Sequence, residues 1–162
     1  MEQKIIKTIV NVCSIPELVP EIQVLISKAK EQVENAYAPY SRFHVGAAVL
    51  LKNGALFVGS NQENAAYPSG LCAERVALFY ANAQFPGVPV KAIAVAAYTN
   101  NEFLAEPITP CGACRQVILE SETRFENSID IYLYGTNYVY HIANAHDLLP
   151  LSFEKESLGE HD

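Results

Sequence analysis

Three cysteines and one glutamate are the residues of this chain that could do chemistry together. Glu74 lies two residues after Cys72, and Cys111 and Cys114 are separated by two residues. Thiolates three positions apart on a helix lie on the same face and can bind one metal ion. Three thiolates would hold a tetrahedral zinc and leave its fourth position to water, as in catalytic rather than structural zinc sites.

The Cys111–Cys114 pair by itself does not decide between zinc and a redox dithiol, because both use a C-x-x-C sequence at a helix N-terminus. Cys72 favours zinc, since a redox pair has no use for a third thiolate. We expect no fourth protein ligand. Cys13 lies in an N-terminal segment, and ligand spacing is missing for the four histidines, His44, His141, His146 and His161.

Glu74 could be an ordinary first-turn glutamate that the helix dipole stabilises. Beside a zinc ligand, its carboxylate could instead act as general base and then general acid. Three thiolates leave the zinc site with a net negative charge, which opposes activation of a bound water. Arg75 is the nearest group that could withdraw this charge by donating hydrogen bonds to the sulfurs, and a surface ion pair is its alternative role.

Hydrophobic spacing predicts the elements that must position these residues. Helices are expected from Pro20 to before Pro39, over 71–83 and over 111–120, so both cysteine groups should open helices. Strands are expected over 43–51, 55–59, 92–97, 129–134 and 138–142, and the first and last pairs should form hairpins. This alternation indicates an α/β sandwich with a mixed sheet.

Length, composition and charge indicate what kind of protein contains this site. We expect the 162 residues to form one domain, with an N-terminal arm at 1–15 that could contain a strand over 5–12, and an acidic tail at 154–162. A net charge of −7 argues against a nucleic-acid partner. The start of the chain lacks the features of a signal peptide, and no apolar run is long enough to span a membrane. A soluble, cytoplasmic protein is the expectation.

The motifs resemble those of the zinc-dependent cytidine deaminases, specifically their small all-cysteine subfamily. The zinc motifs match as C-A-E-R at 72–75 and P-C-G-A-C-R-Q at 110–116. Further matches lie at 37–43, 45–48, 61–67 and 148–150, followed by Phe153, so the resemblance covers about residues 29–153.

The resemblance implies a three-layer α/β/α sandwich around a mixed five-stranded sheet, one Zn²⁺ per chain and Glu74 as the proton carrier. It also implies a homotetramer with shared active sites. The residues that it assigns to the nucleoside substrate are Asn61 and Glu63 at the ribose 3′-hydroxyl, the backbone of Ala73 and of Thr109 at the base, Phe43 at the pyrimidine wall, and Phe153 as a cap over a neighbouring subunit's site. Both phenylalanines could equally be core residues.

The function expected from this resemblance is hydrolytic deamination of cytidine and deoxycytidine in pyrimidine salvage. The nearest alternative is deamination of a cytosine nucleoside antibiotic similar to blasticidin S. A zinc module without catalytic activity and a thiol redox protein are more distant alternatives. The open zinc position and Glu74 oppose the former, and the third thiolate opposes the latter.

Overall fold

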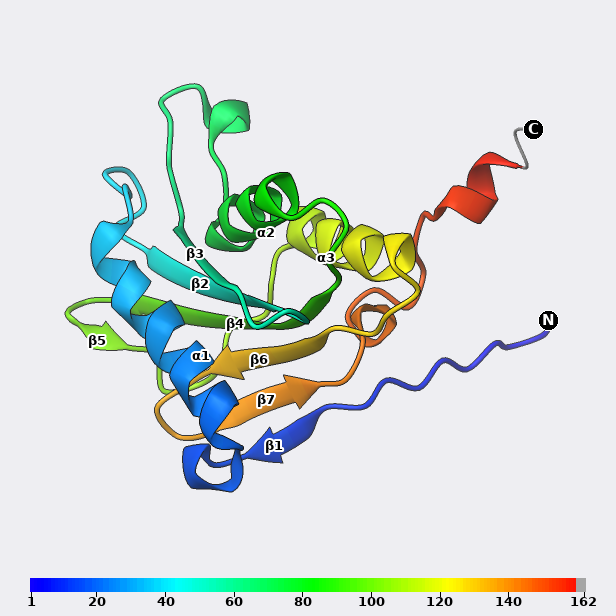
Figure 1. Ribbon diagram of the computed structural model, residues 1–162, viewed down its shortest axis with the longest axis horizontal. Helices are drawn as coiled ribbons and strands as arrows, with labels where there is room; N and C mark the ends of the chain where they lie inside the picture. The colour runs from blue at the N-terminus through cyan, green and yellow to red at the C-terminus, as the bar shows by residue number, and fades with distance from the viewer. Residues whose placement is uncertain (160–162) are drawn as a thin grey trace.

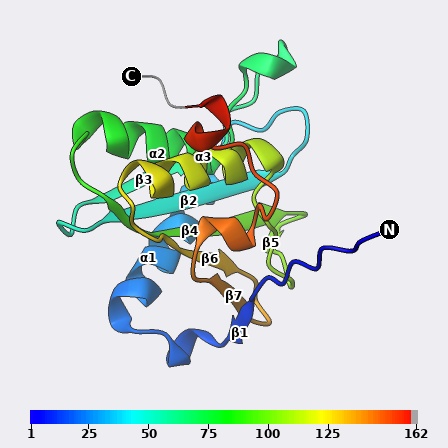
Figure 2. The same cartoon turned by 90° about the vertical axis from the view of Figure 1, so that its right-hand side faces the viewer.

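A mixed β-sheet lies between two layers of helices in the computed structural model, which describes residues 1–159. Helix α1 (Pro20–Glu31) covers one face, while α2 (Ala73–Gln84) and α3 (Gly112–Arg124) cover the other, as Figures 1 and 2 show from two sides. This arrangement confirms the expected α/β sandwich. His161 and the last residues of the expected acidic tail lie outside the described residues.

Two hairpins form at the expected places in the sheet. Strands β2 (His44–Leu51) and β3 (Leu56–Ser60) pair antiparallel, and so do β6 (Asp130–Tyr134) and β7 (Val139–Ile142). The turn between β2 and β3 contains Gly54 at φ +85°, a conformation that glycine adopts at no steric cost. The Asn-Gly signal therefore predicted the first hairpin correctly.

Strand β4 (Val90–Thr99) lies at the centre of the sheet. It pairs antiparallel with β2 and parallel with β6, and all residues of the predicted run at 92–97 are buried. Over residues 1–159 the sheet has seven strands in the order β1-β7-β6-β4-β2-β3, with β5 (Glu102–Phe103) on β4. The sheet thus has two strands beyond the expected five. Strand β1 (Asn11–Cys13) overlaps only the end of the strand suggested over 5–12, and β5 was missed because two residues are too few to show a period.

The helices begin where their cysteines lie, with one correction. Cys72 and Cys111 are the N-caps of α2 and α3, so Cys72 precedes the first turn of α2 in which we expected it. Helix α3 ends at Arg124, four residues beyond its predicted end, because its last turn is polar in sequence yet buries Ser121 and Glu122.

Apolar side chains fill both faces of the sheet. Leu25 and Ile26 of α1 pack on Leu50, while Leu78 and Ile118 pack on the other face. Helix α1 approaches β2 so closely that a Cβ built on Gly46 would lie 2.0 Å from the carbonyl oxygen of Ala29. No helix among the described residues is both long and apolar enough to cross a membrane.

The two ends of the chain leave the sandwich on the same side (Figure 1). Residues 1–10 form no regular element before β1 joins the edge of the sheet by pairing antiparallel with β7. The C-terminal segment crosses α3 and ends in a 3₁₀ turn at Lys155–Leu158.

Candidate metal and substrate site

The caps of α2 and α3 bring three cysteine sulfurs together. The Cys111 sulfur lies 3.8 Å from that of Cys72 and 3.3 Å from that of Cys114, and all three lie within 4.8 Å of one another. A tetrahedral zinc with bonds of about 2.3 Å requires sulfurs about 3.8 Å apart, so this spacing fits a zinc ion. Both helices also direct free backbone N–H groups and positive dipole ends at the cluster, which favours thiolates.

Contacts within the cluster shift the pKa values of Cys72 and Cys114 in opposite directions. Hydrogen bonds from Cys114 and Arg75 lower the pKa of the Cys72 thiol to about 5. The pKa of Cys114 is raised, because its proton bonds the Cys72 sulfur and because the side chain is buried. A bound Zn²⁺ would favour the thiolate form of all three cysteines.

Glu74 lies in the first turn of α2 and is only 4% exposed. Burial raises the pKa of its carboxyl, and this effect outweighs the opposite effect of a hydrogen bond to its own backbone N–H. A buried carboxyl against a metal ligand, with a raised pKa, is suited to accepting and returning a proton.

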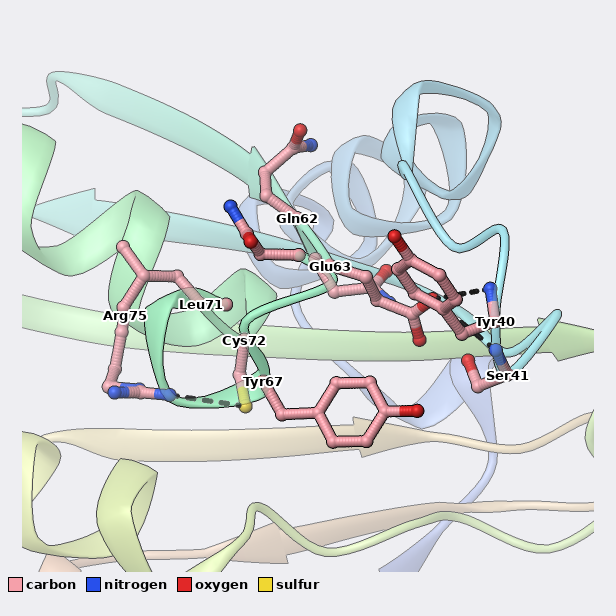
Figure 3. A pocket seen from close by; sticks show the side chains of 11 residues that line it. Tyr40, Ser41, Gln62, Glu63, Tyr67, Leu71, Cys72 and Arg75 are labelled. Atoms are coloured by element: carbon pink, nitrogen blue, oxygen red, sulfur yellow. Dashed lines mark hydrogen bonds between the residues drawn. The ribbon is translucent and has the colours of Figure 1, made fainter.

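Arg75 reaches back along the first turn to the cluster. Its Nη2 donates to the Cys72 sulfur over 3.6 Å, and its buried Nε has no hydrogen-bond partner within the described chain. Figure 3 shows the guanidinium pointing at this sulfur. A donor to a thiolate draws electron density from it, so the contact can offset part of the charge of three sulfurs.

A cavity of about 550 Å³ opens beside Cys72 and Arg75, and Asn61 and Glu63 line its wall (Figure 3). The cavity lies between the loop that follows β3 and the segment containing Tyr40. Its volume is in the range of small-molecule sites. The structure thus brings two expected substrate residues and two residues of the cysteine site to one cavity.

Glu63 also holds the opposite wall of the cavity in place, and Asn61 ties its own wall to the start of β2. The side chain of Asn61 accepts from the Val45 N–H at 2.7 Å and donates to the Phe43 carbonyl at 2.9 Å. The Glu63 carboxylate accepts from the N–H groups of Tyr40 and Ser41 at 2.9 and 3.3 Å. Hydrogen bonds, chiefly from the Ser41 side chain, lower the pKa of Glu63.

The cavity does not include the remaining expected substrate residues. Ala73 is fully buried, Phe43 packs partly buried against the core, and Thr109 is exposed on the loop before α3. Phe153 is 60% exposed. A single chain therefore leaves Phe153 without the apolar surroundings that a core role would require.

Among residues 1–159, His44, His141, His146 and Cys13 do not belong to the cysteine cluster. His44 stacks edge-on against Tyr98, His141 bonds Asp130, and His146 lies 3.7 Å from Glu154. Cys13 belongs to β1 at the edge of the sheet.

Two residues that sequence reasoning left without a role follow Cys114 directly. Arg115 donates to the loop before α3 and to the carbonyl of Leu148, and Gln116 donates to the carbonyl of Phe153. The only signal for them was their place inside the motif at 110–116, because a hydrogen bond to a distant carbonyl leaves no spacing pattern in the sequence.

Comparisons with known proteins agree with this geometry. Residues 20–126 match the family model "Cytidine and deoxycytidylate deaminase zinc-binding region". A cytidine deaminase of Sporosarcina psychrophila is 42% identical over 140 residues, which cover 86% of this chain and 96% of that protein. A cytidine deaminase of Halalkalibacterium halodurans is 41% identical over 141 residues, with 85% and 98% covered.

Solved structures show the same likeness in three dimensions. The crystal structure of cytidine deaminase from Burkholderia pseudomallei superposes with a TM-score of 0.68 at 43% identity, covering 80% of this chain and 97% of that one. The cytidine deaminase of Mycobacterium tuberculosis gives a TM-score of 0.64 at 33% identity, with 82% and 97% covered.

Proposed function

This chain belongs to the cytidine and deoxycytidylate deaminase family, and we propose that it hydrolyses cytidine and deoxycytidine to uridine and deoxyuridine with release of ammonia. One observation carries the proposal: three cysteine sulfurs cluster next to a cavity of about 550 Å³ that Cys72 lines, and the buried Glu74 lies two residues after Cys72 in the first turn of α2. Cytidine deaminases at more than 40% identity over most of the chain support the same activity.

Cys72, Cys111 and Cys114 would hold one zinc ion per chain. When bound, the ion supplies a Lewis acid that lowers the pKa of a water molecule in its open position. Arg75 supports this chemistry by donating to the Cys72 sulfur, which reduces the charge that the thiolates place on the site.

Glu74 is proposed to carry every proton of the reaction. Its carboxylate accepts a proton from the attacking water and delivers it to N3 of the pyrimidine ring. It then takes the second proton of that water to the amino group at C4, which leaves as ammonia while the oxygen stays on C4. Burial favours these transfers, because bulk water cannot compete for the carboxylate.

The substrate contacts follow from the residues around the cavity. Asn61 and Glu63 would bind the ribose 3′-hydroxyl, since each retains hydrogen-bonding capacity beyond its bonds to the chain. The backbone of Ala73 would contact O2 of the base, and the carbonyl of Thr109 would accept from the C4 amino group. Phe43, whose carbonyl Asn61 holds, would form the wall of the pyrimidine pocket.

Shared active sites in a homotetramer would explain two exposed aromatic side chains. Tyr67 borders the cavity and is 77% exposed, and Phe153 is 60% exposed at the end of the segment that crosses α3. Phe153 would cap the active site of a neighbouring subunit. We place this enzyme in pyrimidine salvage in the cytoplasm.

The test is an ultraviolet assay of cytidine and deoxycytidine loss by purified protein, with zinc content measured on the same sample. We expect turnover of both nucleosides, one zinc per chain, and loss of activity with a chelator that returns on adding Zn²⁺. Blasticidin S serves as a third substrate. Turnover of the antibiotic alone would replace the proposal, and zinc-loaded protein without any turnover would refute it.

A further inference from the structure

Arg115 lies one residue after Cys114 and donates three side-chain hydrogen bonds. Its Nε donates to the Pro110 carbonyl at 2.8 Å, its Nη2 to the Thr109 hydroxyl at 2.8 Å, and its Nη1 to the Leu148 carbonyl at 2.9 Å. A planar guanidinium presents these donors in a fixed fork, so all three bonds together specify its orientation. Arg115 thereby joins two distant segments to the helix that carries Cys114.

The loop before α3 has particular need of such a donor. Pro107 and Pro110 have no backbone N–H, and their ring-fixed φ angles keep the loop from forming a regular element. The two acceptors that Arg115 takes from this loop are consecutive, at Thr109 and Pro110. The Arg115 side chain thus gives this loop hydrogen bonds of the kind that neighbouring strands give one another in a sheet.

These two bonds lie on either side of one peptide group. The carbonyl of Thr109 belongs to the peptide between Thr109 and Pro110, and Arg115 bonds the Thr109 hydroxyl on one side and the Pro110 carbonyl on the other. Neither bond uses the Thr109 carbonyl oxygen. Since a peptide group is planar and rigid, holding both of its neighbours sets the direction of that oxygen without occupying it.

We propose that Arg115 is a positioning residue that aims the Thr109 carbonyl at the departing amino group of the substrate. The inference rests on the proposed function, in which that carbonyl accepts a hydrogen bond from the amino group at C4. A bond to the leaving group is made most strongly as ammonia forms, so its misalignment slows turnover more than it weakens substrate binding. Arg115 touches none of the three cysteine sulfurs through these bonds, and zinc content is therefore independent of its role.

The third bond, to the Leu148 carbonyl, suggests an alternative role for Arg115, which is to anchor the C-terminal segment to α3. That segment has two further ties to α3: Gln116 donates to the Phe153 carbonyl at 2.7 Å, and Glu122 accepts from the Ala145 N–H at 3.0 Å. The segment thus keeps these anchors when Arg115 is lost, whereas Thr109 and Pro110, on either side of the peptide that joins them, lose both of their bonds to Arg115.

The experiment compares Arg115→Ala and Arg115→Lys with Arg124→Ala as a matched control. Arg124 lies on the same helix and donates to the Pro86 carbonyl at 3.0 Å, away from the cysteine cluster. For each protein, kcat, KM, zinc content and melting temperature are measured, without and with guanidinium chloride at concentrations far below those that denature.

We expect kcat of Arg115→Ala to fall about 10- to 100-fold, the range for slight misplacement of a reacting group, while KM changes less than about threefold. Zinc content should stay that of the wild type. Guanidinium ion should restore part of kcat to Arg115→Ala, and Arg115→Lys should be intermediate because it keeps the charge without the fork. Arg124→Ala should retain kcat within about twofold of wild type.

Several results would overturn the proposal. These are kcat of Arg115→Ala equal to that of Arg124→Ala, a fall in kcat that matches a fall in zinc content, or no rescue by guanidinium. Normal wild-type turnover with an unaffected Arg115→Ala would remove this inference alone. A zinc-loaded wild type without turnover would remove the proposed function and this inference with it.

Discussion

Replacing Glu122 with alanine tests how α3, the helix that contains Cys114, holds the segments at Ile129 and Ala145. Glu122 lies in the last turn of α3 and is 6% exposed. Its Oε2 accepts from the N–H of Ile129, just before β6, at 2.8 Å and from the N–H of Ala145 at 3.0 Å. Over residues 1–159 it forms no salt bridge, so these two donors are its main compensation for burial.

The expected loss follows from those two bonds. Glu122→Ala leaves two buried N–H groups without an acceptor, at about 1–3 kcal/mol each, so the free energy of unfolding should fall by about 2–6 kcal/mol. A domain is typically stable by only about 5–15 kcal/mol. At about 2–4 °C per kcal/mol for a chain of this size, the melting temperature should fall by roughly 4–24 °C.

Glu122→Gln separates the hydrogen bonds from the charge. A glutamine oxygen can occupy the place of Oε2 and accept from both N–H groups, so the variant should lose less than about 2 kcal/mol. Glu120→Ala is the matched control, since Glu120 is an exposed glutamate on the same helix. Its stability should change by no more than about 0.5 kcal/mol.

Urea and thermal unfolding followed by circular dichroism, at one fixed zinc concentration, measure these differences. The fixed concentration matters because zinc bound to the native state adds to apparent stability. The reasoning is refuted if Glu122→Ala is as stable as Glu120→Ala, or if Glu122→Gln is as unstable as Glu122→Ala.

Two further predictions concern the site and the packing behind it. Glu74→Gln should retain zinc, because all three cysteines are unchanged. Its kcat should fall by about 10²–10⁴-fold through loss of the proton carrier. A zinc-loaded variant with near-normal kcat would remove Glu74 from the mechanism. Gly46→Ala should lower the free energy of unfolding by about 3 kcal/mol or more, because its Cβ would lie 2.0 Å from the Ala29 carbonyl oxygen. Gly87→Ala, whose Cβ would meet nothing within 4 Å, is its control in the same unfolding assay, and equal stability of the two would contradict the packing argument.

Local signals predicted the central strands and the presence of all three α-helices, but α1 ends at Glu31 and continues as a 3₁₀ helix over Gln32–Asn35, short of the expected limit at Pro39. The Asn-Gly pair located the first hairpin, and the unbroken apolar run at 92–97 identified the buried central strand β4. The strands that were missed or only suggested, β1 and β5, have three and two residues, and their pairing depends on β7 and β4 as neighbours. The partners of β1 lie far along the chain, whereas β5 returns onto β4 directly after a two-residue turn at Asn100 and Asn101. Strands this short show no period in the sequence.

The chemistry of the site could be predicted from the sequence because zinc ligation requires particular side chains at short spacings. Cys111 and Cys114 share one helical turn, and Cys72 precedes Glu74 by two residues, so both halves of the site are local. That the two halves meet depends on the sandwich, which places the starts of α2 and α3 together. The sequence alone predicted the residue types of the site but not the distances between them.

Tertiary structure alone decided the supporting contacts. Arg115 bonds Leu148, 33 residues away, and Asn61 bonds the backbone at Phe43 and Val45 across the β2–β3 pair. Each bond uses a backbone acceptor or donor, which every residue offers, so no residue type in the sequence could reveal the partner. Thus the sequence determined which atoms can bind zinc and carry protons, while the fold decided which ordinary backbone groups hold them in place.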